Sequence, residues 1–177
     1  AREVRLVYTP LHGVGAISVL PALKRAGFRD VHVVEAQSSP DGDFPEVENH
    51  IPNPEVPSAL RQAWALAEEL DADLALATDP DADRLGCVAK RTVQGRSEWL
   101  PMNGNQIGSV LCCFVLEELQ RQNRLPPDGL VVKTAVTTDL IPRIADHFGV
   151  GCVSELLVGF KYIGCVIRHL NRPGRFL

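Results

Sequence analysis

Apolar runs alternate with segments of helical periodicity along the whole chain. Short apolar runs predict strands at residues 4–8, 31–34, 74–78 and 85–89. Apolar positions three or four residues apart predict helices at residues 16–25 and 57–70. Gly27 follows the first of these helices, where it is expected to cap the C-terminus. The uninterrupted apolar run at 74–78 is typical of a strand buried on both faces of a parallel sheet.

The same alternation restarts after a polar turn predicted at residues 91–98 and a boundary near residues 102–105. Its predicted elements are a helix at 106–122, a strand at 130–134, a helix at 139–148, a strand at 152–155 and a helix at 160–170. We therefore expect an α/β protein of two α/β/α layered units with mixed, largely parallel sheets. The units are expected at residues 1–103 and 104–177, and the second is expected to be incomplete.

Three carboxylates alternate in the row Asp79-Pro80-Asp81-Ala82-Asp83-Arg84, directly after the apolar run at 74–78. A loop that curls at the end of a strand can turn all three toward one point, and Mg²⁺ prefers such an oxygen cluster. The adjoining arginine indicates that the partner of the metal is an anion, most economically a phosphate. An EF-hand is excluded, because its sixth and twelfth positions would be Arg84 and Lys90. A solvated acidic turn remains the alternative.

Gly13-Val14-Gly15 follows a predicted strand and opens a predicted helix, as a dinucleotide-binding fingerprint does. Ser18 stands where that fingerprint needs its third glycine, so nucleotide binding is the weaker interpretation. We expect instead a tight strand-to-helix turn in which the glycines supply unusual backbone dihedral angles. His12, beside it, is expected to be a turn histidine with satisfied hydrogen bonds. Residues 36–55 predict a long loop that is either functional or a wrap-around connection.

Two lysines stand beside predicted helix starts in the second half of the chain. Lys161 lies in the turn at residues 158–164, where free backbone N–H groups and a lysine could bind an anion, although an exposed helix lysine is the commoner interpretation. Lys133, with the threonines at 134, 137 and 138, forms either an anion-contacting turn or a simple helix N-cap.

Composition limits the classes of partner and the compartment. The net charge is −4 with no basic block, so nothing favours nucleic acid or an anionic membrane. The apolar stretch at 107–116 is far shorter than the roughly 20 residues of a membrane span. Five cysteines without CxxC spacing indicate a reduced, cytoplasmic protein. The chain begins with Ala1 rather than methionine, and we expect it to be a piece of a longer protein.

Six segments together resemble the α-D-phosphohexomutase family, which contains the phosphoglucomutases and phosphomannomutases. The matching segments are 9–15, 41–45, 52–55, 77–86, 103–106 and 159–161, in the order of the family and across nearly the whole chain. The carboxylate row is the specific match, and the other segments corroborate it.

The resemblance implies an enzyme of four domains that uses a phosphoserine, with Mg²⁺ bound to its phosphate and to three aspartates. The phosphoryl group passes to a sugar phosphate, and the resulting bisphosphate reorients and returns a phosphoryl group to the serine. The resemblance implies Asp79, Asp81 and Asp83 as metal ligands and Arg84 as the group that stabilises the phosphoserine charge. Lys161, with Gly159, would lie near the bound sugar phosphate as a phosphate contact or a proton-transfer group.

The departures from the family define the expected extent of the chain. No counterpart is found for the Ser-His phosphoserine loop, the sugar-selecting loop or the phosphate clamp, and Leu156 stands where the family often has threonine. We therefore expect the second domain and the first part of the third, inactive without the remaining domains. Alternatives are a phosphatase of the haloacid-dehalogenase type, which needs a later acidic pair that we do not find, and a non-catalytic domain that binds a metal or a partner.

Overall fold

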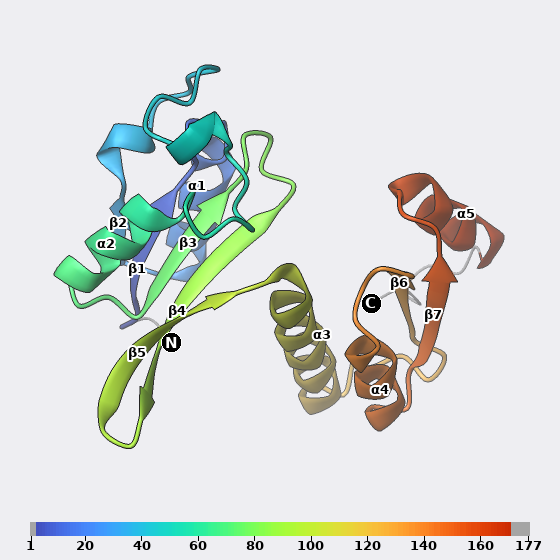
Figure 1. Cartoon of the computed structure of the whole chain (residues 1–177). Coiled ribbons are helices and arrows are strands. Elements are labelled where there is room, and N and C mark those ends of the chain that lie inside the picture. The colour runs from blue at the N-terminus through green and yellow to red at the C-terminus, as the bar shows by residue number, and fades with distance from the viewer. Residues whose placement is uncertain (1–2, 171–177) are drawn as a thin grey trace. The chain divides into compact units, whose positions relative to one another are not determined.

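The computed structural model describes residues 3–170 of the chain and divides it into two compact units, one up to Gly104 and one from Asn105 onward. The first unit contains a five-stranded sheet in the order β2-β1-β3-β4-β5 (Figure 1). Its strands are β1 (Arg5–Thr9), β2 (Asp30–Val33), β3 (Leu74–Thr78), β4 (Leu85–Val93) and β5 (Arg96–Met102). Strand β1 pairs in parallel with both β2 and β3, whereas β3–β4 and β4–β5 are antiparallel.

Two helices and two short 3₁₀ turns complete the first unit. The helices are α1 (Ala16–Ala26) and α2 (Arg61–Glu69), and the 3₁₀ turns are Glu35–Gln37 and Glu48–His50. Helix α1 runs through Pro21 and ends at Gly27, whose positive φ of 90° forms the predicted cap. Helix α2 packs on β1 and β3 through two fully buried alanines, Ala63 and Ala67, which lie in one core cluster with residues of both strands.

Two predicted boundaries in the first unit are wrong. The helix expected from residue 57 begins at Arg61, because the chain from Val56 to Arg61 is held by single i to i+3 turns after Pro57. The polar turn expected at 91–98 is instead the end of a β-hairpin, whose turn is confined to Gln94 and Gly95, both with positive φ. This hairpin end is largely exposed, so it lacks the apolar alternation that predicts a strand.

The second unit contains a parallel pair of strands, β6 (Leu130–Thr134) and β7 (Gly151–Leu156). Its helices are α3 (Gly104–Arg121), α4 (Leu140–His147) and α5 (Phe160–Leu170). Helix α4 packs on both strands, and a cluster of buried apolar residues forms the core: Leu116, Val131, Ile141, Ala145 and Val150. The prediction of an α/β fold with mixed, largely parallel sheets is confirmed. Within residues 3–170, no helix has the length and apolar character needed to cross a bilayer.

Candidate functional site

The three carboxylates lie in the connection between two paired strands. Residues 79–84, which we call the aspartate loop, join β3 to β4, whose Thr78 and Leu85 are register partners. The N–H of Ala82 donates to the carbonyl oxygen of Asp79 at 3.0 Å, and Ala82 has a positive φ of 60°. This turn lets one oxygen of each aspartate lie within 4.8 Å of the other two. The structure therefore places Asp79, Asp81 and Asp83 together, with Asp79 buried and the other two exposed.

Arg84 closes the aspartate loop onto its first residue. Its backbone N–H donates to Oδ1 of Asp79 at 3.0 Å, and its Nε donates to Oδ2 at 2.8 Å. The side chain of Asp79 is 2% exposed, whereas that of Arg84 is 50% exposed. Asp83 lies farther from the guanidinium, at 3.7 Å from Nε. Arg84 is thus fixed at its inner end by a buried carboxylate while its outer end faces solvent.

The surroundings shift the pKa values of Asp79 and Asp83 in opposite directions. Burial raises the pKa of Asp79, but the backbone and side-chain hydrogen bonds from Arg84 outweigh burial, so its pKa lies below the ordinary value. The hydrogen bond with Asp79 and the negative charge of Asp81 raise the pKa of Asp83. One carboxylate of the cluster is therefore held ionised, while crowding of like charge opposes ionisation of another.

The donor set of the aspartate loop fits a small hard cation. Mg²⁺ binds carboxylate oxygens at about 2.1 Å in an octahedral shell, which puts ligand oxygens roughly 3–4 Å apart. The oxygens here lie within 4.8 Å of one another, and Asp81 and Asp83 are exposed and able to adjust. Each oxygen of Asp79 accepts one hydrogen bond from Arg84, and a metal would take the place of the further hydrogen bond that joins Asp79 to Asp83. A cation would also relieve the mutual repulsion of the three carboxylates.

The turn after β1 packs directly on the aspartate loop. The N–H of Val14 donates to the carbonyl oxygen of Pro80 at 2.8 Å. A Cβ atom at Gly13 would overlap the backbone of Pro80, and one at Gly15 would overlap the side-chain oxygens of Tyr8 and Thr78. The expectation that these glycines supply unusual dihedral angles is therefore wrong. They are needed because the backbone of Pro80 approaches Gly13 and the side chains of Tyr8 and Thr78 approach Gly15, which begins α1 with a helical φ of −57°.

The unusual dihedral angles of this turn belong to Leu11 and His12, whose φ values are 49° and 61°. Both residues are buried. His12 is held by loop 36–55, since its Nδ1 lies 2.9 Å from the carbonyl oxygen of Ser39 and its Nε2 accepts from the N–H of Glu46 at 3.3 Å. The predicted turn histidine with satisfied hydrogen bonds is thus present, and its hydrogen bonds join the long loop to the turn that packs on the aspartate loop.

A segment that the sequence did not assign to the site reaches Arg84 from the other side. Oδ1 of Asn53 accepts from Nη1 of Arg84 at 3.3 Å. The next residue, Pro54, is fully buried, and its carbonyl oxygen occupies the space that a Cβ of Gly86 would need. The only sequence signal was the resemblance of residues 52–55 to a family segment, because periodicity cannot pair positions 31 residues apart.

The two site candidates of the second unit lie at the start of α5. Gly159 has a φ of 130°, which only glycine adopts readily, and its carbonyl oxygen accepts from the N–H of Tyr162 at 3.1 Å. Lys161 is exposed, with Nζ 5.0 Å from the centre of the Tyr162 ring. Phe160 between them is 86% exposed. This turn thus presents a cation and large apolar side chains to solvent.

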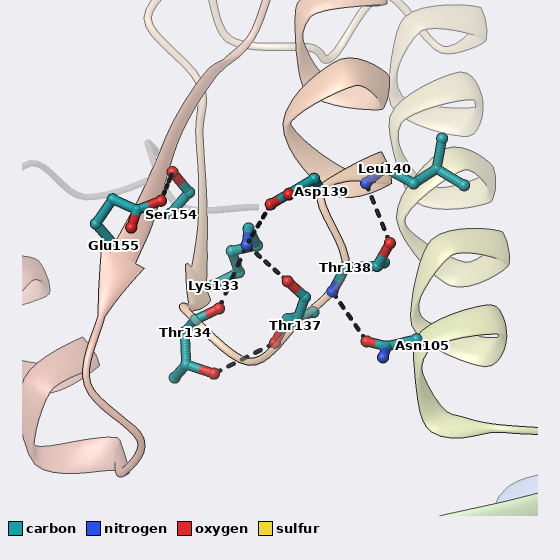
Figure 2. Close-up of polar contacts among 9 residues, drawn as sticks. All are labelled: Asn105, Lys133, Thr134, Thr137, Thr138, Asp139, Leu140, Ser154 and Glu155. Atoms are coloured by element: carbon teal, nitrogen blue, oxygen red, sulfur yellow. Dashed lines mark hydrogen bonds and ion pairs between the residues drawn. The ribbon is translucent and has the colours of Figure 1, made fainter.

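Lys133 does not present its ammonium to solvent. Its side chain is 4% exposed, and Nζ donates to the carbonyl oxygens of Thr137 at 2.7 Å and Thr134 at 3.4 Å (Figure 2). Asp139 lies 3.5 Å from the same nitrogen. Just before α4, Oγ1 of Thr138 accepts from the N–H of Leu140 at 3.2 Å. The residue directly before α4, Asp139, makes no side-chain cap bond, so the turn is not a simple N-cap, and the ammonium of Lys133 binds its carbonyl oxygens from the interior.

Similarity to solved structures identifies the fold. A phosphoglucomutase/phosphomannomutase family protein from Burkholderia thailandensis matches with a TM-score of 0.70 and 24% identity, over 96% of this chain and 32% of that chain. An N-acetylglucosamine-phosphate mutase, described as a member of the α-D-phosphohexomutase superfamily, matches in its apo form with a TM-score of 0.53 and 15% identity, over 95% and 36%. At these identities the likeness concerns the fold alone.

Sequence comparison identifies the family. Residues 1–95 match the family described as phosphoglucomutase/phosphomannomutase, alpha/beta/alpha domain II, and residues 103–172 match its alpha/beta/alpha domain III. A phosphoglucomutase of Staphylococcus epidermidis is 35% identical over 175 residues, covering 99% of this chain and 30% of the relative. A probable phosphoribomutase of Schizosaccharomyces pombe is 35% identical over 177 residues, covering 99% and 29%.

The chain belongs to the phosphoglucomutase/phosphomannomutase family. The resemblance drawn from the motif order is thereby confirmed, and the haloacid-dehalogenase alternative is not supported. The chain spans about 30% of the length of these curated relatives.

Proposed function

We propose that this chain supplies the Mg²⁺ loop of a sugar-phosphate mutase. The enzyme would move a phosphoryl group between the 1- and 6-positions of a sugar phosphate, or equivalent positions, through a phosphoserine and a bisphosphate intermediate. The observation that carries the proposal is the aspartate loop, where three carboxylates converge within 4.8 Å beside an arginine fixed on one of them. Membership in the family supports the type of reaction.

Asp79, Asp81 and Asp83 would hold the ion, and Asp79 would anchor it because its carboxylate is buried and ionised. When bound, Mg²⁺ supplies neutralisation of the charge on a transferring phosphoryl group. The negative charge of the three side chains needs such a partner, since two of them are exposed and close together. A phosphate oxygen would complete the shell, so we expect weak binding of Mg²⁺ or Mn²⁺ without phosphate.

Arg84 would bind the phosphoserine oxygens through the outer end of its guanidinium. Its pKa is raised by the hydrogen bond to Asp79, which keeps the guanidinium charged under all conditions of interest. Its Nε already donates a hydrogen bond to Asp79, so the orientation of the guanidinium plane is set before a ligand binds. Preorganised charge of this kind is the main contribution that a protein makes to phosphoryl transfer.

Gly159 and Lys161 would contact the phosphate of the sugar substrate. They stand at the start of α5, where free backbone N–H groups favour an anion. The exposed ammonium of Lys161 adds a mobile positive charge, suited to a phosphate contact or to proton transfer. The relatives include a phosphoglucomutase and a probable phosphoribomutase, so the proposal covers hexose and pentose phosphates.

The remaining domains of the enzyme would supply the phosphoserine and the loops that select the sugar. The relatives are about three times as long as the stretch they share with this chain, which supports such partners. A cytoplasmic location is supported by the cysteines, since all five are unpaired.

Metal binding to the chain tests the proposal directly. Titration with Mn²⁺, followed by electron paramagnetic resonance, should show one weak site that Mg²⁺ displaces. Asp81→Asn should weaken Mn²⁺ binding at least tenfold. Asp43→Asn is the matched control, because it neutralises an exposed aspartate of the same unit outside the cluster and should leave the affinity unchanged. Equal affinity in all three proteins would contradict the metal site.

An activity assay tests the proposal that the phosphoserine lies in another domain of the enzyme. In a coupled assay with glucose 1-phosphate, we expect no mutase activity from this chain alone. Sustained turnover by the chain alone would refute the proposal that the nucleophile lies in another domain.

A further inference from the structure

Two nitrogens of the Arg84 side chain donate hydrogen bonds to acceptors from distant parts of the chain. Nε donates to the buried carboxylate of Asp79 at 2.8 Å, and Nη1 donates to Oδ1 of Asn53 at 3.3 Å. A guanidinium is planar, so two acceptors at different nitrogens fix the position and the orientation of the plane. Among the described residues, these are the hydrogen bonds that its side chain makes, which leaves Nη2 for a ligand.

The acceptor on Asn53 is itself held rigidly. Its Oδ1 also accepts from the N–H of Glu55 at 3.0 Å, which fixes the amide so that oxygen, and not nitrogen, faces Arg84. The N–H of Asn53 donates to the carbonyl oxygen of Ile51 at 2.8 Å. Pro54, directly after it, lies against Gly86 of β4, two residues beyond Arg84. The segment 53–54 is thus locked onto the strand that begins where the aspartate loop ends.

We infer that Asn53 is a positioning residue that aims the guanidinium of Arg84 at a phosphate bound beside the aspartate loop. Without Asn53, Arg84 would keep its bond to Asp79 but could swing its outer nitrogens through solvent, because its side chain is 50% exposed. Asn53 does not belong to the aspartate cluster, so the inference separates phosphate binding from metal binding. It rests on the proposed function in one respect, namely that Arg84 faces a phosphate.

Two substitutions separate the contact to Arg84 from the local turn. Asn53→Ser keeps a side-chain oxygen that can accept from the N–H of Glu55, but its side chain is too short to reach Arg84. Asn53→Asp keeps an acceptor for both donors and should hold the guanidinium of Arg84 in the same orientation. Asp41→Ala is the structural control, because Asp41 makes the same kind of turn with the N–H of Asp43, at 2.9 Å, in the same long loop.

The test measures the affinity of the complete 177-residue chain for an N-acetylated phosphoserine amide at saturating Mn²⁺. We expect Asn53→Ser to weaken this affinity about tenfold, the effect of about one hydrogen bond to a charged group. Mn²⁺ affinity without phosphoserine should be unchanged in Asn53→Ser. In an Arg84→Ala background, Asn53→Ser should have no further effect.

A second measurement needs no ligand and separates this inference from the proposed function. In ¹⁵N spectra of the arginine side chain, rotation of the Arg84 guanidinium should be hindered in the wild type and in Asp41→Ala, and free in Asn53→Ser. Unchanged rotation together with unchanged phosphoserine affinity would overturn the role of Asn53 while leaving the metal site standing. Absence of phosphoserine binding in the wild type would overturn the phosphate-directed role and the proposed function together.

Discussion

The N–H of Val14 donates to the carbonyl oxygen of Pro80 at 2.8 Å, so the turn after β1 is hydrogen-bonded directly to the aspartate loop. This bond joins two connections that leave adjacent parallel strands, β1 and β3, at the same edge of the sheet. Such an edge is where α/β proteins commonly bind ligands. The shape of the candidate metal site therefore depends on residues far from it in sequence.

Substitution of Gly13 tests this support. In Gly13→Ala the new methyl group would overlap the backbone of Pro80, so the two connections must separate. We expect a loss of about 1–3 kcal/mol in the free energy of unfolding and weaker Mn²⁺ binding. Gly42→Ala is the control, because a Cβ there meets no atom within 4 Å. Urea unfolding and Mn²⁺ titration should show no loss in the control, and equal behaviour of both variants would contradict the packing argument.

Asp79 and Asp81 should differ in what they contribute. Asp79→Asn replaces one oxygen with a donor, so either the N–H or the Nε of Arg84 loses its acceptor. Because Arg84 is half exposed, we expect a moderate loss of about 1–3 kcal/mol in stability, together with loss of metal binding. Asp81→Asn removes an exposed ligand and relieves repulsion within the cluster, so the free energy of unfolding should be unchanged or slightly higher. Chemical denaturation without metal compares them, and equal stability of the two variants would argue against an anchoring role for Asp79.

Acid should weaken the link between β1 and β2. The hydrogen bonds from Arg5 and then His32 lower the pKa of Asp30 below its ordinary 3.8. A carboxyl whose pKa is lowered on folding stabilises the fold above its unfolded pKa, and this contribution is lost as the pH falls through the folded pKa. Asp30→Asn should therefore be less stable than wild type at neutral pH and approach it below about pH 4. Unfolding measured across this range checks it, and a stability difference that stays constant down to pH 2 would contradict the linkage.

Cys87 should resist alkylation in the folded protein. Burial raises the pKa of its thiol to about 11, so at pH 8 about one molecule in a thousand carries the reactive thiolate. Cys113 and Cys165 are exposed and should react first with iodoacetamide. Peptide mass spectrometry should show Cys87 modified only at higher pH or after addition of urea. Labelling of Cys87 as rapid as that of Cys165 at pH 8 would show that β4 is less well packed than described.

Lys133 should stabilise the second unit without needing any ligand. In Lys133→Met the carbonyl oxygens of Thr134 and Thr137 lose a buried donor, and we expect a loss of about 1–3 kcal/mol. Lys161→Met, at an exposed position, should change stability by less than about 0.5 kcal/mol. Hydrogen exchange at residues 134–139 should be faster only in the first variant. Unaltered exchange there would contradict a stabilising role for the hydrogen bonds of Lys133.

Strands and helices with a clear apolar pattern could be predicted from the sequence alone. Strand β3 has the predicted bounds and helix α5 begins at the predicted residue, because each has a regular apolar pattern and a breaker where it begins. The end of the β4–β5 hairpin was not predicted, since Arg91 and Glu98 pair across exposed strands and leave no apolar alternation. Pairing between polar residues is a property of the sheet and has no periodic signature in one chain.

In the site too, contacts within one short loop could be predicted from the sequence, whereas contacts between distant segments could not. The spacing of Asp79, Asp81 and Asp83 was enough to expect that their side chains converge, because they share one short loop. The hydrogen bonds that Arg84 donates to Asn53 and that Val14 donates to Pro80 span 31 and 66 positions, so the spacing of residues in the sequence does not reveal them. The role of the glycines at 13 and 15 was wrongly assigned for the same reason, since their neighbours lie in another segment.

The two successive left-handed residues, Leu11 and His12, have a consequence for the order in which this protein folds. Each costs about 1–2 kcal/mol relative to the right-handed conformation. This cost is offset by the bonds that Ser39 and Glu46 make to His12, which exist only after the long loop has docked. The turn should therefore reach this conformation only once the long loop has docked. We expect recovery of Mn²⁺ binding during refolding to follow docking of that loop and not to precede it.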